Sequence, residues 1–392
     1  MRGLKRNIEI STLPGNKSIA FVINSLEGGG AERVICNLLD IMTDIFSARR
    51  LKVRLILLDK LPEQQKCPHY VEKVTFDSRG KLLNSFFSLN QWVKNNRPDL
   101  LVSFLTRSNI ISTIIGRRNN IPTIISERVN TTSHFSASKL GFVSRAMVRM
   151  VYPKASLVVP VSQGVMRDLV DNYQVPKSKC RVMYNAYDQV SLLEKANCVV
   201  TDLPKNNYIV GIGRLVPNKN FSLLLNAFAI SNSQRDLVIL GRGPEMSALN
   251  ALSVNLNIDK RVHLLGFKEN PYPYISNADY LISSSNAEGF PNGIVEAMCL
   301  GKPVIATNCE SGPAELLTGD SLTKTASYLC AEYGILCPVN DVTAMEQAIN
   351  VMENPNVAKK YQRSSMQRGQ SFSCEAMCNT FNQLMDRVLL RS

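Results

Sequence analysis

Short apolar runs alternate with helix-like stretches along the whole chain, and this alternation restricts the possible folds more than any other feature. In the first half the runs are Ile19–Ile23, Val53–Leu58, Leu100–Phe104, Thr123–Ser126 and Leu157–Val161. In the second half they are Tyr208–Ile212, Asp236–Leu240, Val262–Leu265, Tyr280–Ser283 and Val304–Thr307. Buried strands that alternate with helices are typical of α/β domains with mainly parallel sheets.

The chain has 392 residues, which is long for one hydrophobic core and sufficient for two. A polar stretch over residues 188–205 separates the two halves. We therefore predict an N-terminal domain over residues 1–195 and a second domain over residues 196–374, both doubly wound and Rossmann-like, facing a central cleft. Residues 375–392 are predicted to form an amphipathic helix that packs back on the N-terminal domain.

The composition favours a globular protein, with 45% hydrophobic and 20% charged residues. The ten cysteines form no CxxC pair and the three histidines are scattered, so a structural zinc site is not expected. The N-terminus lacks the apolar core of a secretory signal, and no apolar run approaches the roughly 18 residues that span a membrane. We expect a cytoplasmic protein with reduced thiols.

The positive charge of the chain is concentrated in its first half. The net charge is +13, and residues 1–195 hold 29 basic and 15 acidic side chains, which leaves residues 196–392 close to neutral. This asymmetry favours an anionic partner surface. No nucleic-acid-binding motif accompanies it, so an anionic membrane surface is the expected partner.

The segment Glu288–Met298 carries two carboxylates on either side of a predicted helix start. Glu288 lies in a Gly/Pro loop that follows a strand-like run, and Glu296 lies on a short helix that Pro291 can open. Ligands bind to open parallel sheets where a loop leaves the carboxyl end of a strand and enters a helix. The helix N-terminus attracts phosphate, and carboxylates accept hydrogen bonds from ribose and sugar hydroxyls. The segment suits a sugar–diphosphate–nucleoside ligand; the alternative is an exposed loop before a helix whose Glu296 is merely solvated.

Two glycine turns are further candidates for contact with phosphate. The turn Gly28–Gly30 lacks the GxGxxG spacing of a dinucleotide fold and the P-loop pattern, so it either approaches a ligand closely or is a plain tight turn. In the second half, Gly213 is followed by Arg214 and Lys219. A guanidinium and an ammonium that converge there would neutralise a diphosphate, unless both are ordinary surface charges.

These motifs together resemble those of the retaining family-4 glycosyltransferases of the GT-B fold. The matching segments are GGGAER after the first strand, GRLVPNKN at the start of the second domain, LGRGPE, and EGFPNGIVEAM followed by GKPVIAT. The resemblance covers nearly the whole chain and is more specific in the second half. Residues 126–128 and 311–315 further resemble members that extend bacterial surface polysaccharides or lipid-linked oligosaccharides, often from UDP-hexoses or UDP-N-acetylhexosamines.

The resemblance implies roles for individual residues. Arg214 and Lys219 would hold the diphosphate, Glu288 would contact the donor sugar, and Glu296 would bind the ribose hydroxyls. Other residues implied to line the site are Gly28, Gly29, Gly30, Gly213, Gly289, Phe290, Pro291 and Asn292. Many relatives carry a histidine near the sugar, and this neighbourhood holds Glu127 and Arg128 instead. Either of them fills that role, or His134 swings in, or no such contact exists.

The resemblance also implies a reaction. We expect transfer of a hexose or N-acetylhexosamine, with retention of configuration, from a nucleoside-diphosphate sugar to a lipid-linked or oligosaccharide acceptor at the inner face of the cytoplasmic membrane. No cofactor and no metal are expected, because the two cations neutralise the leaving group. The alternatives are a soluble transferase that makes a small glycoside and a catalytically silent glycan-binding or scaffold subunit.

The segment 138–154 is a candidate for contact with the acceptor lipid or the membrane. Helical spacing puts Leu140, Val143, Met147, Met150 and Val151 on one arc, with Arg145 and Arg149 opposite. Such a helix would rest at a bilayer interface or hold a polyprenyl diphosphate. An ordinary helix that packs this arc on the first domain is the alternative.

Overall fold

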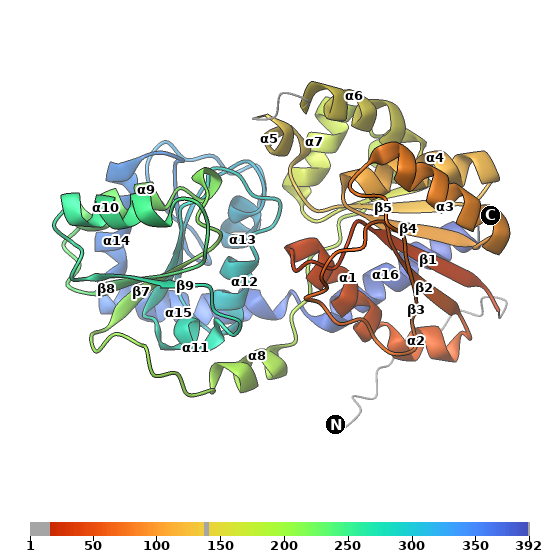
Figure 1. The fold of residues 1–392 in the computed structure, drawn as a ribbon. Helices are drawn as coiled ribbons and strands as arrows, with labels where there is room; N and C mark the ends of the chain where they lie inside the picture. Colours follow the sequence, from red (N-terminus) through yellow and green to blue (C-terminus); the bar gives the residue numbers. More distant parts are fainter. Residues whose placement is uncertain (1–15, 137–140, 391–392) are drawn as a thin grey trace. The chain divides into compact units, whose positions relative to one another are not determined.

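The computed structural model describes residues 16–136 and 141–390, and it divides the chain into two compact units (Figure 1). Unit 1 comprises Met1–Asn185 and Cys374–Ser392, and unit 2 comprises Ala186–Ser373. The division after Asn185 precedes the expected boundary at residue 195. The reason is helix α8 (Gln189–Ala196), which Asp188 caps and which packs on helices of unit 2.

Unit 1 contains a six-stranded sheet with the order β3-β2-β1-β4-β5-β6, and its strand pairs are all parallel. The strands are β1 (Ser18–Ile23), β2 (Lys52–Leu57), β3 (Glu72–Thr75), β4 (Leu100–Phe104), β5 (Thr123–Glu127) and β6 (Leu157–Pro160). The sequence pattern did not predict β3. It is a short, mostly exposed edge strand with charged residues, so it lacks the apolar run that marks its neighbours.

Helices cover both faces of this sheet. They are α1 (Gly30–Ile41), α2 (Thr43–Ala48), α3 (Leu82–Asn96), α4 (Thr106–Asn119), α5 (Thr131–Phe135), α6 (Gly141–Val151), α7 (Gln163–Tyr173) and the short 3₁₀ turns η1 (Tyr152–Lys154) and η2 (Lys177–Lys179). Apolar side chains of α3 and α4 pack on Ala20 and Val22 of β1. Because side chains alternate along a strand, Phe21 faces the other side, where its ring lies 6.2 Å from that of Phe46 on α2.

The last helix of the chain, α16 (Cys374–Leu389), belongs to unit 1 and lies beside α1 (Figure 1). Its Phe381 ring lies 5.9 Å from that of Phe21. The buried Arg49 guanidinium binds the Asp386 carboxylate at 2.6 and 3.1 Å. The C-terminal helix therefore completes the core of the first unit.

Unit 2 contains a seven-stranded sheet with the order β12-β13-β11-β10-β7-β8-β9. The strands are β7 (Tyr208–Ile212), β8 (Asp236–Leu240), β9 (Val262–Gly266), β10 (Tyr280–Ser283), β11 (Val304–Thr307), β12 (Leu329–Cys330) and β13 (Ile335–Cys337), and only β12 runs antiparallel to its neighbour. The sequence did not predict β12 or β13, which have two and three residues and are too short to give a pattern.

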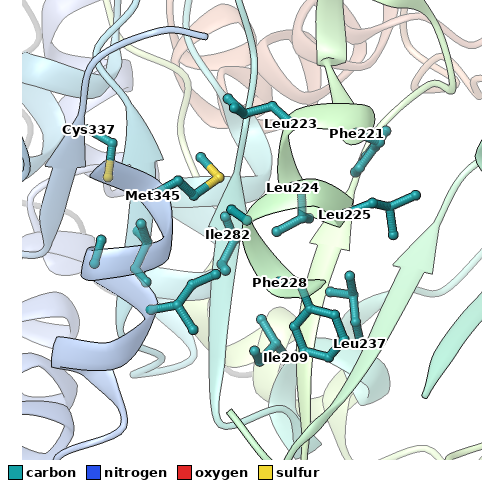
Figure 2. Close-up of a cluster of buried hydrophobic side chains, with 14 of the residues drawn as sticks. Ile209, Phe221, Leu223, Leu224, Leu225, Phe228, Leu237, Ile282, Cys337 and Met345 are labelled. Carbon is teal, nitrogen blue, oxygen red and sulfur yellow. The ribbon is translucent and has the colours of Figure 1, made fainter. Parts of the chain in front are cut away.

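The helices of unit 2 surround this sheet. They are α8, α9 (Phe221–Ile230), α10 (Met246–Asn255), α11 (Tyr272–Asn277), α12 (Asn292–Cys299), α13 (Pro313–Thr318), α14 (Val342–Met352) and α15 (Pro355–Gln370), with the 3₁₀ turn η3 (Pro217–Lys219). Figure 2 shows the apolar core on one face, where Phe228 of α9 packs with Ile209 and Leu237 of the strands, and Met345 of α14 lies nearby. The two doubly wound parallel sheets confirm the predicted α/β class.

No helix in the described parts of the chain is both long and apolar enough to cross a bilayer.

Candidate active site

Two loops of unit 2 bring Lys219 and Glu288 together. Strands β7 and β10 are parallel neighbours, so the loops that follow them leave the same edge of the sheet. The Lys219 ammonium forms an ion pair with the Glu288 carboxylate. Their side chains are only 22% and 11% exposed, so this pair lies in a largely water-excluded place. The structure thus joins two of the three predicted catalytic residues.

Backbone and side-chain hydrogen bonds fix these two loops to each other. The Ser284 hydroxyl donates to the Lys219 carbonyl at 2.8 Å. Asn218 joins the loops twice, because its carbonyl accepts from the Asn286 N–H and its amide donates to the Ala287 carbonyl, both at 2.8 Å. Lys219 and Glu288 are therefore held in place by their neighbours in the chain.

Asn220 is a positioning residue to which the sequence analysis gave no role. It has the left-handed conformation, with φ of 47°, and its side-chain oxygen accepts from the Leu223 N–H to cap α9. Its amide donates to the side chains of Asn286 at 3.0 Å and Asn340 at 2.8 Å. Asparagine tolerates left-handed backbone, and its presence in the segment GRLVPNKN was the available signal.

Two glycines lie close to Lys219 and its loop, and close packing requires Gly241 while it leaves little room at Gly213. A Cβ on Gly213 would lie 3.3 Å from Cδ of Lys219, and a Cβ on Gly241 would lie 1.7 Å from the Gly213 carbonyl oxygen. The segment LGRGPE, which contains Gly241, thus packs directly against the backbone of the turn after β7. Arg214 follows this turn; it is exposed and forms no ion pair with any residue that the structure describes.

Helix α12 begins next to Glu288 and carries Glu296 in its second turn. Pro291 is the N-cap, and the loop before α13 packs against its ring, because a Cβ on Gly312 would lie 2.5 Å from Cδ of Pro291. Gly312 has φ of +97°, which favours glycine. Glu296 is buried, and the Tyr272 hydroxyl lies 3.5 Å from its carboxylate.

The remaining predicted residues of this loop, Phe290 and Asn292, contact the segments where the chain enters and leaves unit 2. The Tyr187 hydroxyl donates to the Asn292 side-chain oxygen at 2.5 Å. The Phe290 ring lies 5.6 Å from that of Phe372. Gly289 lies between Glu288 and Phe290 in the same loop. Tyr187 and Phe372 were not predicted, since no local pattern relates them to the loop.

In unit 1, the glycine turn lies at the corresponding place after β1. Gly28 has φ of +112°, Gly29 caps α1, and Gly30 is its first residue. All three are exposed. The turn thus opens a helix of twelve residues, with the positive end of the helix dipole at an exposed backbone.

Glu127 and Arg128 lie at the end of β5, and internal partners hold both side chains. Glu127 is completely buried and accepts hydrogen bonds from the Tyr152 hydroxyl and the Arg128 N–H. Burial raises the pKa of the Glu127 carboxyl, and these hydrogen bonds oppose the shift only in part. The Arg128 guanidinium is also buried and donates to the side chains of Ser126 and Asn185. His134, on α5, is exposed and its ring packs edge-on against Phe135.

Helix α6 differs from the predicted amphipathic arrangement. Leu140 lies outside the described residues, and the predicted arc does not face one environment. Val151 is buried, but Val143 and Met150 are 52% and 60% exposed, and Phe142 beside them is 74% exposed. The helix buries the small face that contains Gly141 and Val148 and presents apolar side chains to solvent.

Comparisons with known proteins assign the family. Residues 28–189 match the model described as Glycosyltransferase Family 4, and residues 199–368 match Glycosyl transferases group 1. A Campylobacter jejuni protein is 30% identical over 368 residues, which cover 91% of this chain and 96% of that protein. The chain belongs to the family-4 glycosyltransferases. The resemblance predicted from the motifs is therefore confirmed.

The C. jejuni relative of this glycosyltransferase is named N-acetylgalactosamine-N,N'-diacetylbacillosaminyl-diphospho-undecaprenol 4-alpha-N-acetylgalactosaminyltransferase. A lipopolysaccharide 1,6-galactosyltransferase of Salmonella typhimurium is 24% identical, over 76% of this chain and 82% of that protein.

Solved structures agree with the fold. HepE of Anabaena, in complex with UDP, superposes with a TM-score of 0.72 and 21% identity over 94% of this chain and all of that one. Sucrose-phosphate synthase of Thermosynechococcus elongatus gives a TM-score of 0.77 and 18% identity over 96% of this chain and all of that one. These similarities support the GT-B fold for the glycosyltransferase.

Proposed function

We propose that this glycosyltransferase moves a hexose or N-acetylhexosamine from a UDP-sugar to a lipid-linked glycan in the synthesis of a bacterial surface polysaccharide of the O-antigen or capsule type. The observation that carries this proposal is the Lys219–Glu288 pair, held at the carboxyl edge of the sheet beside the N-terminus of α12. The names of the C. jejuni and S. typhimurium relatives support a lipid-linked or lipopolysaccharide acceptor. The complex of HepE with UDP supports the uridine nucleotide.

The ion pair explains how the site tolerates its charges before the donor binds and what changes afterwards. In the ion pair, the Lys219 ammonium and the Glu288 carboxylate neutralise each other in a largely buried place. A diphosphate brought to this edge offers Lys219 stronger anionic partners, with Arg214 as the second cation. Glu288 is then released to accept hydrogen bonds from hydroxyls of the sugar ring. One carboxylate thus serves as counter-ion first and as sugar ligand second.

The nucleoside half of the donor would lie along α12. The helix N-terminus favours the phosphate charge, and Glu296 in the second turn accepts from the ribose hydroxyls. Tyr272, beside Glu296, would hold that carboxylate in place.

The chemistry proposed is retention without a protein nucleophile. Breaking the bond between the sugar C1 and the phosphate oxygen leaves negative charge on the diphosphate, and Lys219, Arg214 and the α12 dipole stabilise it. The acceptor hydroxyl attacks C1 from the same face, and its proton passes to the departing phosphate oxygen. Glu288 lies beside a cation and is not assigned as nucleophile. Because two cations neutralise the leaving group, we assign no metal and no cofactor to this step.

The enzyme is further proposed to work at the inner face of the cytoplasmic membrane as a peripheral protein. Residues 1–195 carry the whole positive excess of the chain. Helix α6 of unit 1 exposes Phe142, Val143 and Met150 next to the exposed Arg149. Apolar side chains flanked by cations are typical of helices that lie in a bilayer interface.

The test is to screen nucleotide sugars for thermal stabilisation of the purified protein and to assay the best donor with a membrane lipid extract. Transfer of the labelled sugar to an extractable lipid, with release of UDP, is expected. Transfer only to a water-soluble acceptor would indicate a soluble transferase and contradict a lipid-linked acceptor. A folded protein that neither hydrolyses nor transfers any donor would point to a silent binding subunit.

A further inference from the structure

Unit 1 has a concave region away from the carboxyl edge of its sheet, where Gly28 and Glu127 lie. It is a cavity of about 650 Å³ at the opposite, amino ends of β5 and β6, and both Thr123 and Leu157 line it. The end of α4 and the last turn of α16 form its other walls. Because parallel sheets bind substrate at their carboxyl edge, this cavity lies outside the proposed donor and acceptor machinery.

Four cations from four different segments line this cavity. Arg117 comes from α4, Lys154 from η1, Lys179 from η2 and Arg387 from α16. No lining residue is acidic or aromatic among those that the structure describes. Basic residues in the last turns of α4 and α16 complement the dipoles of those helices, but no long helix explains Lys154 and Lys179.

The cavity is accompanied by a smaller hollow that extends it along α4. This hollow of about 370 Å³ shares Thr113, Arg117 and Lys154 with the cavity and adds Arg118 together with the apolar side chains Ile114 and Val151. Ile114 is 39% exposed, and Val151 is the last residue of α6, which packs on α4. The cationic cavity therefore continues into a hollow whose apolar lining is Ile114 and Val151.

Neutral partners hold some of these cations in position without cancelling their charge. The Lys179 ammonium donates to the carbonyls of Pro153 at 2.8 Å and Ala155 at 3.0 Å. The Arg387 guanidinium donates to the Ser178 carbonyl at 3.2 Å. Arg117, Arg118 and Lys154 form no ion pair with any residue in the described part of the chain. Such a cluster has an unfavourable self-energy that an anion would relieve.

We propose that this cavity binds the phosphate group of an anionic phospholipid headgroup, with the acyl chains leaving through the hollow that Ile114 and Val151 line. The exposed Ser156 also lines the cavity; its hydroxyl oxygen accepts from the Thr123 N–H at 3.1 Å, and its proton would complete the phosphate coordination. The absence of an aromatic lining, among the described residues, disfavours a nucleotide base. This assignment rests on the proposed function of the enzyme at a membrane surface, and it specifies which part of unit 1 would bind a lipid.

The experiment compares two pairs of substitutions that remove the same charge. Arg117→Gln/Lys154→Gln changes two exposed residues of the cavity, and Lys260→Gln/Lys359→Gln changes two exposed residues of unit 2. Each protein is sedimented with vesicles of phosphatidylglycerol and phosphatidylcholine and with vesicles of phosphatidylcholine alone. We expect the cavity variant to bind the anionic vesicles about thirtyfold more weakly than wild type, and the control variant to bind like wild type. Equal loss in both variants, or none in either, would overturn the proposal.

A second experiment distinguishes a phospholipid headgroup from a free phosphate compound, because either could place a phosphate in the cavity. Glycerol 3-phosphate is added in thermal unfolding of the wild type and the cavity variant. Selective stabilisation of the wild type, combined with equal vesicle binding, would assign the cavity to a free phosphate compound and overturn the headgroup. Transfer to a detergent-solubilised acceptor is measured in parallel and should not differ between the two proteins. Failure of the wild type to transfer would reject the proposed function, while the vesicle comparison would still decide the lipid contact.

Discussion

The hydroxyl of Tyr187, at the start of unit 2, donates to the side chain of Asn292, the first residue of α12. Phe372, near the end of unit 2, packs its ring against Phe290 in the same loop. The segment that leads from β10 into α12 therefore contacts residues at both ends of unit 2. Its geometry depends on residues that lie more than 70 positions away in the sequence.

Tyr187→Phe should raise the KM for the donor several-fold and change kcat less, because it frees the start of α12 without removing a charge. The lost hydrogen bond is worth about 1 kcal/mol. The matched control is Tyr208→Phe, which removes a hydroxyl bond of 2.7 Å to the Tyr274 carbonyl elsewhere in unit 2. The KM and kcat of both variants are measured by steady-state kinetics. An equal change of KM in the two variants would indicate a general loss of stability and not a specific effect at the start of α12.

Lys219→Ala and Arg214→Ala should each lower turnover by roughly two to three orders of magnitude, the scale of losing one preorganised charge. Lys268→Ala serves as control, since it breaks another ion pair of unit 2, with Asp202. Turnover is measured at saturating donor, and folding is checked by circular dichroism. A folded double variant with wild-type turnover would remove both residues from the leaving-group site.

Glu296→Ala should weaken binding of UDP by about ten- to a hundredfold, because a hydrogen bond to a charged group contributes roughly 1.5–3 kcal/mol. Calorimetry with UDP and with its 2′,3′-dideoxy analogue identifies the contact. Wild type should prefer UDP, and the variant should bind both compounds alike. A variant that still prefers UDP would take Glu296 away from the ribose hydroxyls.

Glu127→Gln should change how the stability of the enzyme depends on pH. Burial raises the pKa of the Glu127 carboxyl in the folded state, so the folded protein binds this proton more tightly than the unfolded chain. The free energy of unfolding therefore falls as the pH rises from the ordinary glutamate range through the raised pKa. The substituted amide would stay neutral and should flatten that fall. Urea titrations from about pH 4 to about pH 8 measure it, and parallel curves for the two proteins would contradict the assignment.

Arg149→Glu, combined with Phe142→Ser, should weaken binding to anionic vesicles and leave transfer to a solubilised acceptor intact. Both side chains are exposed on α6, so the fold should tolerate the change. Reversing one charge and removing one apolar contact should together cost more than about tenfold in binding. Co-sedimentation at rising salt is the measurement. Binding equal to wild type at each salt concentration would remove α6 from the docking surface.

The strands with strong apolar runs could be predicted almost to the residue, because burial on both faces leaves a continuous pattern. Strand β10 and helix α12 were also predictable, since Pro291 and Gly301 mark the ends of the helix. Exposed β3 and the very short β12 and β13 carry too little pattern to be recognised.

Features of the site that lie within one short segment could be predicted, and contacts between residues far apart in the sequence could not. Local motifs identified Lys219 and Glu288 separately, and the resemblance gave them roles. Their direct ion pair joins residues 69 positions apart and depends on the neighbouring order of β7 and β10. Sheet order is a property of the whole domain, so no local pattern reports it. The same holds for Asn220, whose bond to Asn340 spans 120 positions.

The return of α16 to unit 1 has a consequence for the newborn chain. Synthesis proceeds from the N-terminus, so the sheet of unit 1 leaves the ribosome first, while Phe381 and Asp386 are made only after the whole of unit 2. Until then Phe21 lacks its contact with Phe381 and the Arg49 guanidinium lacks its carboxylate. Unit 2 is one continuous segment and has all its residues earlier. Unit 1, which begins the polypeptide, therefore completes its folding after unit 2 has been made, and a ribosome that stalls within α16 would leave unit 1 exposed to chaperones and proteases.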